Sequence, residues 1–165
     1  MYKVIRIFVF LFLAAIIYAG CTADDICSEE TQTTPKMVIS FADHKISGIA
    51  KPLNHIKITN IEYDTIVWDA PAESISIPLS TEMDRSTYSF TIVKEGVSYT
   101  NTYQFDYNRK EVYVSRACGY KMHYTDLKAK DISNTDSTTP TWAQFITILN
   151  PIVEDEKSAH ITILH

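Results

Sequence analysis

The chain has 165 residues, of which 45% are hydrophobic, 12% aromatic and 21% charged, and it contains only four glycines. This much apolar and aromatic material excludes a disordered, collagen-like or coiled-coil chain and fits one globular domain. The net charge of −5 argues against a nucleic-acid partner, because a surface that neutralises phosphates must be basic.

The first 20 residues are interpreted as an export signal peptide. Lys3 and Arg6 precede an uninterrupted apolar run, Ile7 to Ala19, and no acidic residue occurs among them, which is the layout of a secretory signal. The run has 13 residues, whereas a helix that spans a bilayer needs about 20. A permanent transmembrane anchor is therefore the less favoured alternative.

The signal ends in Ala19-Gly20-Cys21, and a small pair before a cysteine resembles the lipobox of bacterial lipoproteins. In that motif the cysteine is lipidated and becomes the first residue of the mature chain, so we predict that Cys21 is the lipid-attachment site. Tyr18 departs from the motif, in which an aliphatic residue is more common at this position. Ordinary signal cleavage with an unmodified Cys21 is the alternative.

The expected mature chain begins with an acidic segment. Removing residues 1–20 takes away Lys3 and Arg6 and no acid, so the 15 basic residues become 13 against 20 acidic ones and the charge falls from −5 to −7. Residues 21–35 are interpreted as a leash from the membrane to the folded domain. Within it, Asp24 and Asp25 resemble the acidic signal that sends lipoproteins to the cell surface in Bacteroidetes, although acids are equally common in solvated linkers.

Residues 36–165 are expected to form a single all-β domain. Their apolar residues recur at every second position, the period of a half-buried strand, and predict about nine strands. Short antiparallel strands hide their apolar faces best as two packed sheets, so we expect an antiparallel β-sandwich, of which the immunoglobulin-like arrangement is one form, with an open barrel as the alternative. The alternating positions are Met37–Phe41, Ile56/Ile58, Ile66/Trp68, Ile75/Ile77/Leu79, Tyr88/Phe90/Ile92, Tyr103/Phe105/Tyr107, Val112/Val114, Ile146/Ile148 and Ile161/Ile163.

Polar segments separate the strands. Lys94-Glu95-Gly96 and Asn108-Arg109-Lys110 are interpreted as turns. Lys128 to Thr141 is a longer run of polar turn-forming residues, longer than most connections inside a compact domain. We interpret it as a surface excursion, with a binding loop as the alternative.

Several segments together resemble a family of small Bacteroidetes lipoproteins that carries only a domain-of-unknown-function label. The resemblance covers nearly the whole mature chain, and Val-Ser-Arg-Ala-Cys-Gly-Tyr is its most specific part. It implies an envelope location and no activity. Together with the lipobox, it leads us to expect an outer-membrane protein, on the periplasmic side or at the cell surface. The segments are Asp24 to Glu30, Thr33 to Pro35, Ile75 to Leu79, Arg109 to Tyr120 and Ala159 to Ile161.

No catalytic or metal-binding motif is found, and we expect neither an enzyme nor a cofactor. Zinc sites use His and Cys at short spacings, whereas the histidines here are scattered, and no Gly-x-Ser-x-Gly motif is present. Acidic clusters such as Glu154-Asp155-Glu156 lack the alternating frame of a calcium loop and are interpreted as solvated charge. The histidines are His44, His55, His123, His160 and His165.

Aromatic residues gather along one predicted strand, at the odd positions Tyr99, Tyr103, Phe105 and Tyr107. Such a stripe could stack on sugar rings or a peptide, but it is more typical of the core face of a sandwich, where tyrosine buries its ring. Trp142, after the long polar loop, is likewise interpreted as a packing anchor, with a ligand lid as the alternative.

Two further predictions concern charge and cysteine pairing. Once Cys21 is lipidated, an exported chain retains one pair of cysteines, so Cys27 and Cys118 are expected to form a disulfide, with free thiols or intermolecular pairing as the alternatives. Arg116 falls on the alternating apolar line of a strand expected over residues 112–122. A buried ion pair with Glu29 or Glu30 would compensate the charge of Arg116 there. The alternative is an arginine at a strand end whose guanidinium group reaches water.

These features favour a protein that acts by binding or assembly. The first interpretation is an accessory of an envelope complex, for example docked to an outer-membrane β-barrel protein, which should expose an apolar or aromatic patch. The alternative is a carbohydrate- or peptide-binding surface module, which should have a concave site with an exposed Trp or Tyr.

Overall fold

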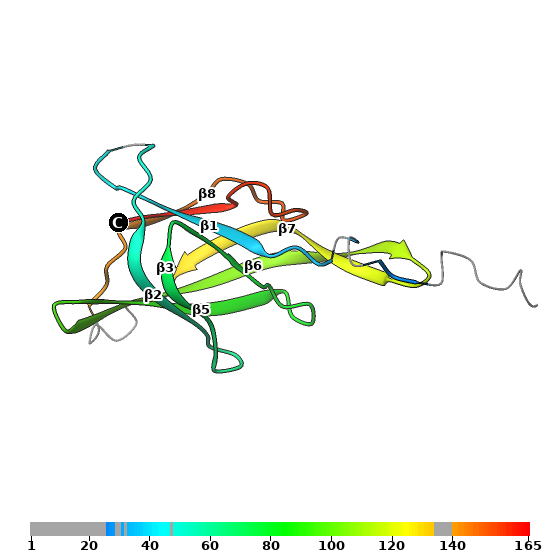
Figure 1. The fold of residues 1–165 in the computed structure, drawn as a ribbon, viewed down its shortest axis with the longest axis horizontal. Helices are drawn as coiled ribbons and strands as arrows, with labels where there is room; N and C mark the ends of the chain where they lie inside the picture. The colour runs from blue at the N-terminus through cyan, green and yellow to red at the C-terminus, as the bar shows by residue number, and fades with distance from the viewer. Residues whose placement is uncertain (1–25, 29–30, 32, 47, 134–139) are drawn as a thin grey trace, which may run out of the picture. The chain divides into compact units, whose positions relative to one another are not determined.

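The structure is a computed structural model that describes residues 26–28, 31, 33–46, 48–133 and 140–165. The chain divides into two compact units: the first comprises Met1–Gln32 and Tyr113–Lys121, and the second comprises Thr33–Val112 and Met122–His165. We call them the hairpin unit and the sandwich unit, and Figure 1 shows the strands that build them. Within the described residues, no helix is long and apolar enough to cross a membrane.

The described residues form nine strands and no helix, which confirms the all-β prediction. The strands lie in two sheets, one of order β4-β1-β9-β8 and one of order β3-β2-β5-β6-β7 (Figure 1). Their bounds are β1 Met37–Ala42, β2 Leu53–Asn60, β3 Thr65–Ala72, β4 Ser74–Ile77, β5 Arg85–Lys94, β6 Val97–Ser115, β7 Gly119–Asp131, β8 Phe145–Ile148 and β9 Ile161–Leu164.

The neighbouring strands β1–β4, β2–β3, β2–β5, β5–β6 and β8–β9 pair in antiparallel fashion. Strands β1 and β9 run parallel, with Ile39 opposite Ile161. The β5–β6 hairpin pairs Lys94 with Val97 and turns at Glu95 and Gly96. Both turn residues have positive φ, 52° and 79°, as a two-residue type I′ turn requires. The immunoglobulin-like arrangement stays a prediction.

The core lies between the inner faces of the two sheets. Inward positions of β1, β5 and β6 alternate with half-buried ones, as the period of two predicts. Tyr103, Phe105 and Tyr107 on β6 are buried, and Tyr99 packs against the core from a half-buried position. Trp142 is also buried, and its indole Nε1 donates to the Phe90 carbonyl at 2.9 Å. The aromatic stripe and Trp142 are therefore core residues, as predicted.

The boundaries of β6 and β7 differ from the prediction. Val112/Val114 is not a separate strand, because β6 continues from Val97 through the predicted turn at residues 108–110 as far as Ser115. The strand that the alternation did not predict is β7, where Tyr124 and Leu127 are buried three positions apart. Asp126, with φ of 55°, lies between them, and such an irregularity shifts which face the side chains occupy. Alternation in the sequence therefore fails at this strand.

His160 joins β1 to the residues before β9. It is buried, its Nδ1 accepts a hydrogen bond from the Val38 amide at 3.0 Å, and its own amide donates to the Val38 carbonyl at 2.8 Å. Burial lowers the pKa of His160, and this effect outweighs the opposing influence of Asp155 and Glu156. The ring is therefore held neutral.

This arrangement predicts a loss of stability in mild acid. A neutral histidine contributes its full stability above the unfolded-state pKa of 6.5 and loses it as the pH falls through the lower pKa of the folded state, at about 1.4 kcal/mol for each unit of lowering. His160→Asn keeps an acceptor near the Val38 amide and removes the titration, so the decline in urea midpoint between pH 7 and 5 should be smaller in that variant. His44→Asn, at an exposed position, should decline like the unmodified protein. Equal declines in all three would contradict the role of His160.

Candidate ligand pocket

A pocket of about 250 Å³ opens in the sandwich unit where the end of β2, the start of β3 and the segment after β4 meet. We call it the Tyr63 pocket. Its walls are almost entirely apolar where they face the open space. The lining residues are Asn60, Glu62, Tyr63, Thr65, Val67, Pro78, Leu79, Ser80, Met83, Ser86 and Tyr88.

The rim of the pocket is formed by an unusual turn between β2 and β3. Asp64 adopts a positive φ of 49° in this turn, and the side-chain Oδ1 of Asn60 accepts a hydrogen bond from the Tyr63 amide at 2.9 Å. Asn60 is itself buried, so this hydrogen bond attaches the turn to the folded core. Tyr63 is left 59% exposed and Met83 39% exposed, so two large side chains stand at the mouth of the pocket in contact with water.

The floor is held rigid by tyrosine hydroxyls that bind the backbone of residues 78–80. Tyr88 donates to the Pro78 carbonyl, and Tyr124 donates to the Leu79 carbonyl at 3.1 Å. The Tyr107 hydroxyl accepts from the Ser80 amide at 2.8 Å and lies 2.7 Å from the Ser86 hydroxyl. This segment would otherwise be a loose connection, and the hydroxyls satisfy its buried polar groups.

The floor is also uncharged. Burial raises the pKa of Tyr88 to about 12 and raises the pKa values of Tyr107 and Tyr124. The three hydroxyls therefore remain protonated and able to donate near neutral pH. The walls are mostly apolar, and Glu62 is the one charged residue of the lining. An apolar guest is favoured over an anionic one, because an anion would lose its hydration there without gaining a partner of opposite charge.

The size of the pocket restricts that guest. Sites for small molecules usually have volumes of about 300–1,000 Å³, and the Tyr63 pocket is smaller. It is suited to one apolar side chain. It also adjoins β3, the edge strand of the five-stranded sheet. Asp69 and Pro71 lie in the second half of β3, and charge and proline are devices that protect a sheet edge from pairing, whereas residues 65–68 beside the pocket carry neither.

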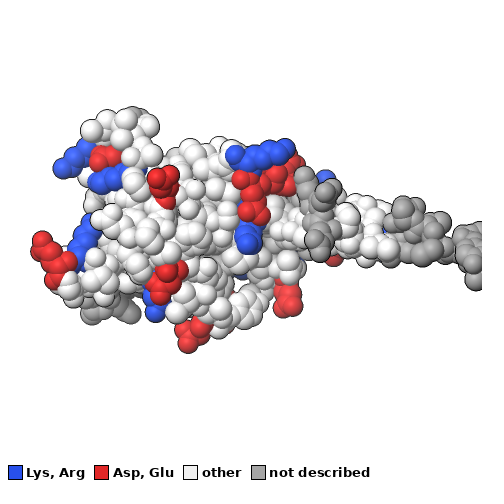
Figure 2. All heavy atoms as spheres, viewed as in Figure 1, with Lys and Arg blue, Asp and Glu red and all other residues white. Residues whose placement is uncertain are grey.

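A second, larger pocket of about 380 Å³ is polar. Its charged residues are all paired: Arg85 Nε lies 2.7 Å from Asp106 Oδ1, and Lys128 Nζ lies 2.8 Å from Asp126 Oδ2. Asp84 Oδ1 lies 2.6 Å from Nε of Arg109, which is outside the lining. Burial acts to raise the pKa of Asp106, but hydrogen bonds from Arg85 and Gln104 outweigh it and leave the pKa lowered. Figure 2 likewise shows acidic and basic groups interspersed over the visible face rather than gathered by sign. Paired charges of this kind leave little attraction for a charged ligand.

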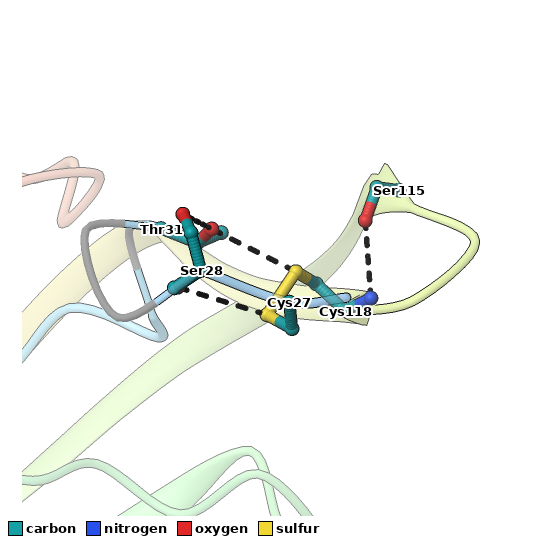
Figure 3. The surroundings of a disulfide bond; sticks show 5 residues. All are labelled: Cys27, Ser28, Thr31, Ser115 and Cys118. Atoms are coloured by element: carbon teal, nitrogen blue, oxygen red, sulfur yellow. Dashed lines mark hydrogen bonds between the residues drawn. A yellow bond between two sulfur atoms is a disulfide. The ribbon is translucent and has the colours of Figure 1, made fainter. Parts of the chain in front are cut away.

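The predicted disulfide is confirmed in the hairpin unit. Cys27 and Cys118 are bonded across a sequence separation of 91, with their Cα atoms 4.9 Å apart (Figure 3). In the turn that carries this cysteine, the Cys118 amide donates to Ser115 Oγ at 3.0 Å. Gly119, which follows it, has a positive φ of 70°. Thr31 Oγ1 lies 3.7 Å from the Cys118 sulfur.

Arg116 is not where the alternation predicted it. Residues 116–118 form the turn between β6 and β7, and Arg116 is exposed there. The predicted burial is wrong, because the chain reverses at the point where a continuous strand was expected. Its expected partners, Glu29 and Glu30, lie outside the described residues, as do Cys21, Asp24 and Asp25.

The remaining predicted positions do not converge on a site. Among the described residues, no three His, Cys, Asp or Glu side chains lie close enough together to hold a metal ion. His55 Nε2 lies 3.3 Å from Asp69 Oδ1 at the surface, and His165 is buried against the Phe41 and Trp142 rings. The polar loop predicted over residues 128–141 is partly strand, since β7 extends to Asp131, and residues 134–139 lie outside the described part.

The fold and the pocket define a β-sandwich protein with a small apolar pocket beside one sheet edge. The chain belongs to a family of unknown function, DUF6452, whose match spans residues 55–165. No curated protein and no solved structure matches the chain.

Sequence reasoning did not find the Tyr63 pocket. Its lining comes from two stretches of the chain, residues 60–67 and 78–88, which the folded sandwich brings together. One signal was present: Ile61 and Tyr63 are large apolar residues in a turn, where solvation usually selects small polar ones. Both remain about half exposed, at 49% and 59%.

Proposed function

We propose that this protein is an outer-membrane lipoprotein, anchored through lipid on Cys21, that acts by binding as an accessory of an envelope complex. Its partner in this proposal is an outer-membrane β-barrel protein. An extended segment of that partner lies along the open half of β3 and inserts one apolar side chain into the Tyr63 pocket.

The observation that carries this proposal is the Tyr63 pocket beside an unprotected sheet edge. Extended segments commonly bind by adding a strand to such an edge, where main-chain hydrogen bonds supply affinity and a side-chain pocket supplies specificity. A pocket of about 250 Å³ takes a single large side chain, and buried anchors of this kind dominate the energy of many protein interfaces.

The membrane anchor rests on the sequence. Ala19-Gly20-Cys21 follows the apolar run of an export signal, and the resemblance to Bacteroidetes lipoproteins supports the same location. Asp24 and Asp25 fit a surface-export signal, which would place the domain on the outer face. The Cys27–Cys118 disulfide is consistent with folding in an oxidising compartment.

The test is recovery of a partner from crosslinked membranes. The unmodified protein should recover a membrane protein in stoichiometric amount. Tyr63→Glu and Met83→Glu place a charge at the apolar rim and should reduce that recovery by about tenfold or more, since losing an interface anchor costs 1.4 kcal/mol or above. Val93→Glu is a matched control, because Val93 is 62% exposed and lies outside the pocket lining.

Equal recovery by the rim variants and the control would contradict docking at the pocket. One observation also favours the alternative function, a peptide- or carbohydrate-binding module: Tyr63 is an exposed aromatic ring at the mouth of a concave site. If no membrane protein is recovered and a soluble peptide or glycan instead protects Tyr63 from oxidation, that alternative replaces the first.

A further inference from the structure

The hairpin unit carries exposed aromatic surface that the proposed partner does not use. Tyr113 and Tyr120 face each other across the β6–β7 turn with their ring centroids 5.4 Å apart in an edge-to-face arrangement. They are 56% and 67% exposed, and Ile26, next to the disulfide, is 73% exposed. Exposed aromatic side chains that lie together are a feature of interaction sites.

The covalent structure limits where these side chains can be. Cys27 is bonded to Cys118, so the turn that lies between Tyr113 and Tyr120 is tied to the chain six positions after Cys21. Six residues in extended conformation reach about 20 Å at most. If Cys21 carries the lipid, this unit is therefore held within reach of the bilayer surface, at a high effective concentration.

The chemistry of the unit suits that surface. Tyrosine is enriched at membrane–water interfaces because its ring is apolar and its hydroxyl remains hydrated. Arg116 is exposed in the turn, and a guanidinium group binds phosphate through paired hydrogen bonds. The charged residues among the described residues of this unit are Arg116 and Lys121, both basic. Asp24, Asp25, Glu29 and Glu30, which lie outside the described residues, make a zwitterionic lipid surface a better partner than an anionic one.

We propose that the hairpin unit is a membrane-contact element in which Tyr113, Tyr120 and Ile26 insert at the lipid headgroup level and Arg116 binds lipid phosphates. This inference rests on the proposed lipid anchor at Cys21. It goes beyond the anchor because it fixes the orientation of one unit at the bilayer, which an acyl chain on a free leash would not do.

Hydroxyl-radical footprinting of the complete mature protein tests the contact and needs no substitution of the tyrosines. The protein is purified from membranes, reconstituted on phosphatidylethanolamine–phosphatidylcholine vesicles, and compared with the Cys21→Ser chain in solution. Oxidation of Tyr113 and Tyr120 should fall about threefold or more on the vesicles, as expected for rings at the headgroup level. Tyr63, which is 59% exposed in the sandwich unit, is the internal control and should change little.

The outcomes separate the two proposals. A mature mass without acyl groups on Cys21 overturns the anchor and the contact with it. A lipidated protein whose Tyr113 and Tyr120 oxidise as fast on vesicles as the Cys21→Ser chain does in solution overturns the contact alone. Equal protection of Tyr63 also overturns it, because the bilayer would then cover both units without preference for the hairpin.

Discussion

Replacing Cys27 and Cys118 together with serine is expected to lower the free energy of unfolding by about 4 to 5 kcal/mol and the melting temperature by roughly 10 to 20 °C. The disulfide closes a loop with a sequence separation of 91, which contains all of β1 to β6. A crosslink across so long a loop removes much of the conformational freedom of the unfolded chain. The double replacement avoids leaving one reactive thiol.

The measurement is urea unfolding of residues 21–165 carrying Cys21→Ser, which lacks the proposed lipid attachment site. Ser28→Ala with Thr31→Ala is the matched control, because it removes the hydrogen bond of 3.0 Å beside the disulfide and leaves the bridge in place. That control should cost less than about 1 kcal/mol, as exposed hydrogen bonds do. Equal midpoints for the disulfide-free chain and the control would show that the bridge does not constrain the unfolded state.

Much of the fold could be predicted because its core depends on one local rule. Strands with one face on a core alternate in burial, and β1, β5 and the central part of β6 follow that alternation residue by residue. The rule failed where burial does not alternate. Residues 108–111 of β6 are exposed in succession, so they resembled a turn, and β7 changes its buried positions at Asp126.

The disulfide and the pocket differ in what determines them. Pairing of Cys27 with Cys118 followed from counting thiols in a chain that the sequence predicts to be exported, and it required no three-dimensional information. The Tyr63 pocket depends on how residues 78–83 cross the end of β2, a path set by tyrosine hydroxyls on β5, β6 and β7. No local pattern in residues 78–83 reveals those long-range hydrogen bonds.

Asn101 shows the same kind of long-range dependence, and its replacement with alanine is expected to cost about 3 to 5 kcal/mol. Asn101 is buried on β6, where its Oδ1 accepts from the amides of Trp142 and Ala143 at 3.0 Å each. Its Nδ2 donates to Asp131 Oδ2 at 3.0 Å. Alanine would leave two buried amides without an acceptor, and each such loss costs about 1 to 3 kcal/mol.

The effect should spread to the segment that carries Trp142. The Trp142 indole donates to the Phe90 carbonyl at 2.9 Å, and this contact depends on the backbone at residues 142 and 143 being held against β6. Asn101→Ala should therefore also shift the tryptophan emission toward that of an exposed ring. The measurement combines urea unfolding with fluorescence of the folded state. Asn108→Ala on the same strand is the control, since Asn108 is exposed and its loss should change stability by less than about 0.5 kcal/mol. A small cost for Asn101→Ala with unchanged emission would mean that water replaces the amide oxygen, and that this segment is held by packing of the Trp142 ring rather than by hydrogen bonds to Asn101.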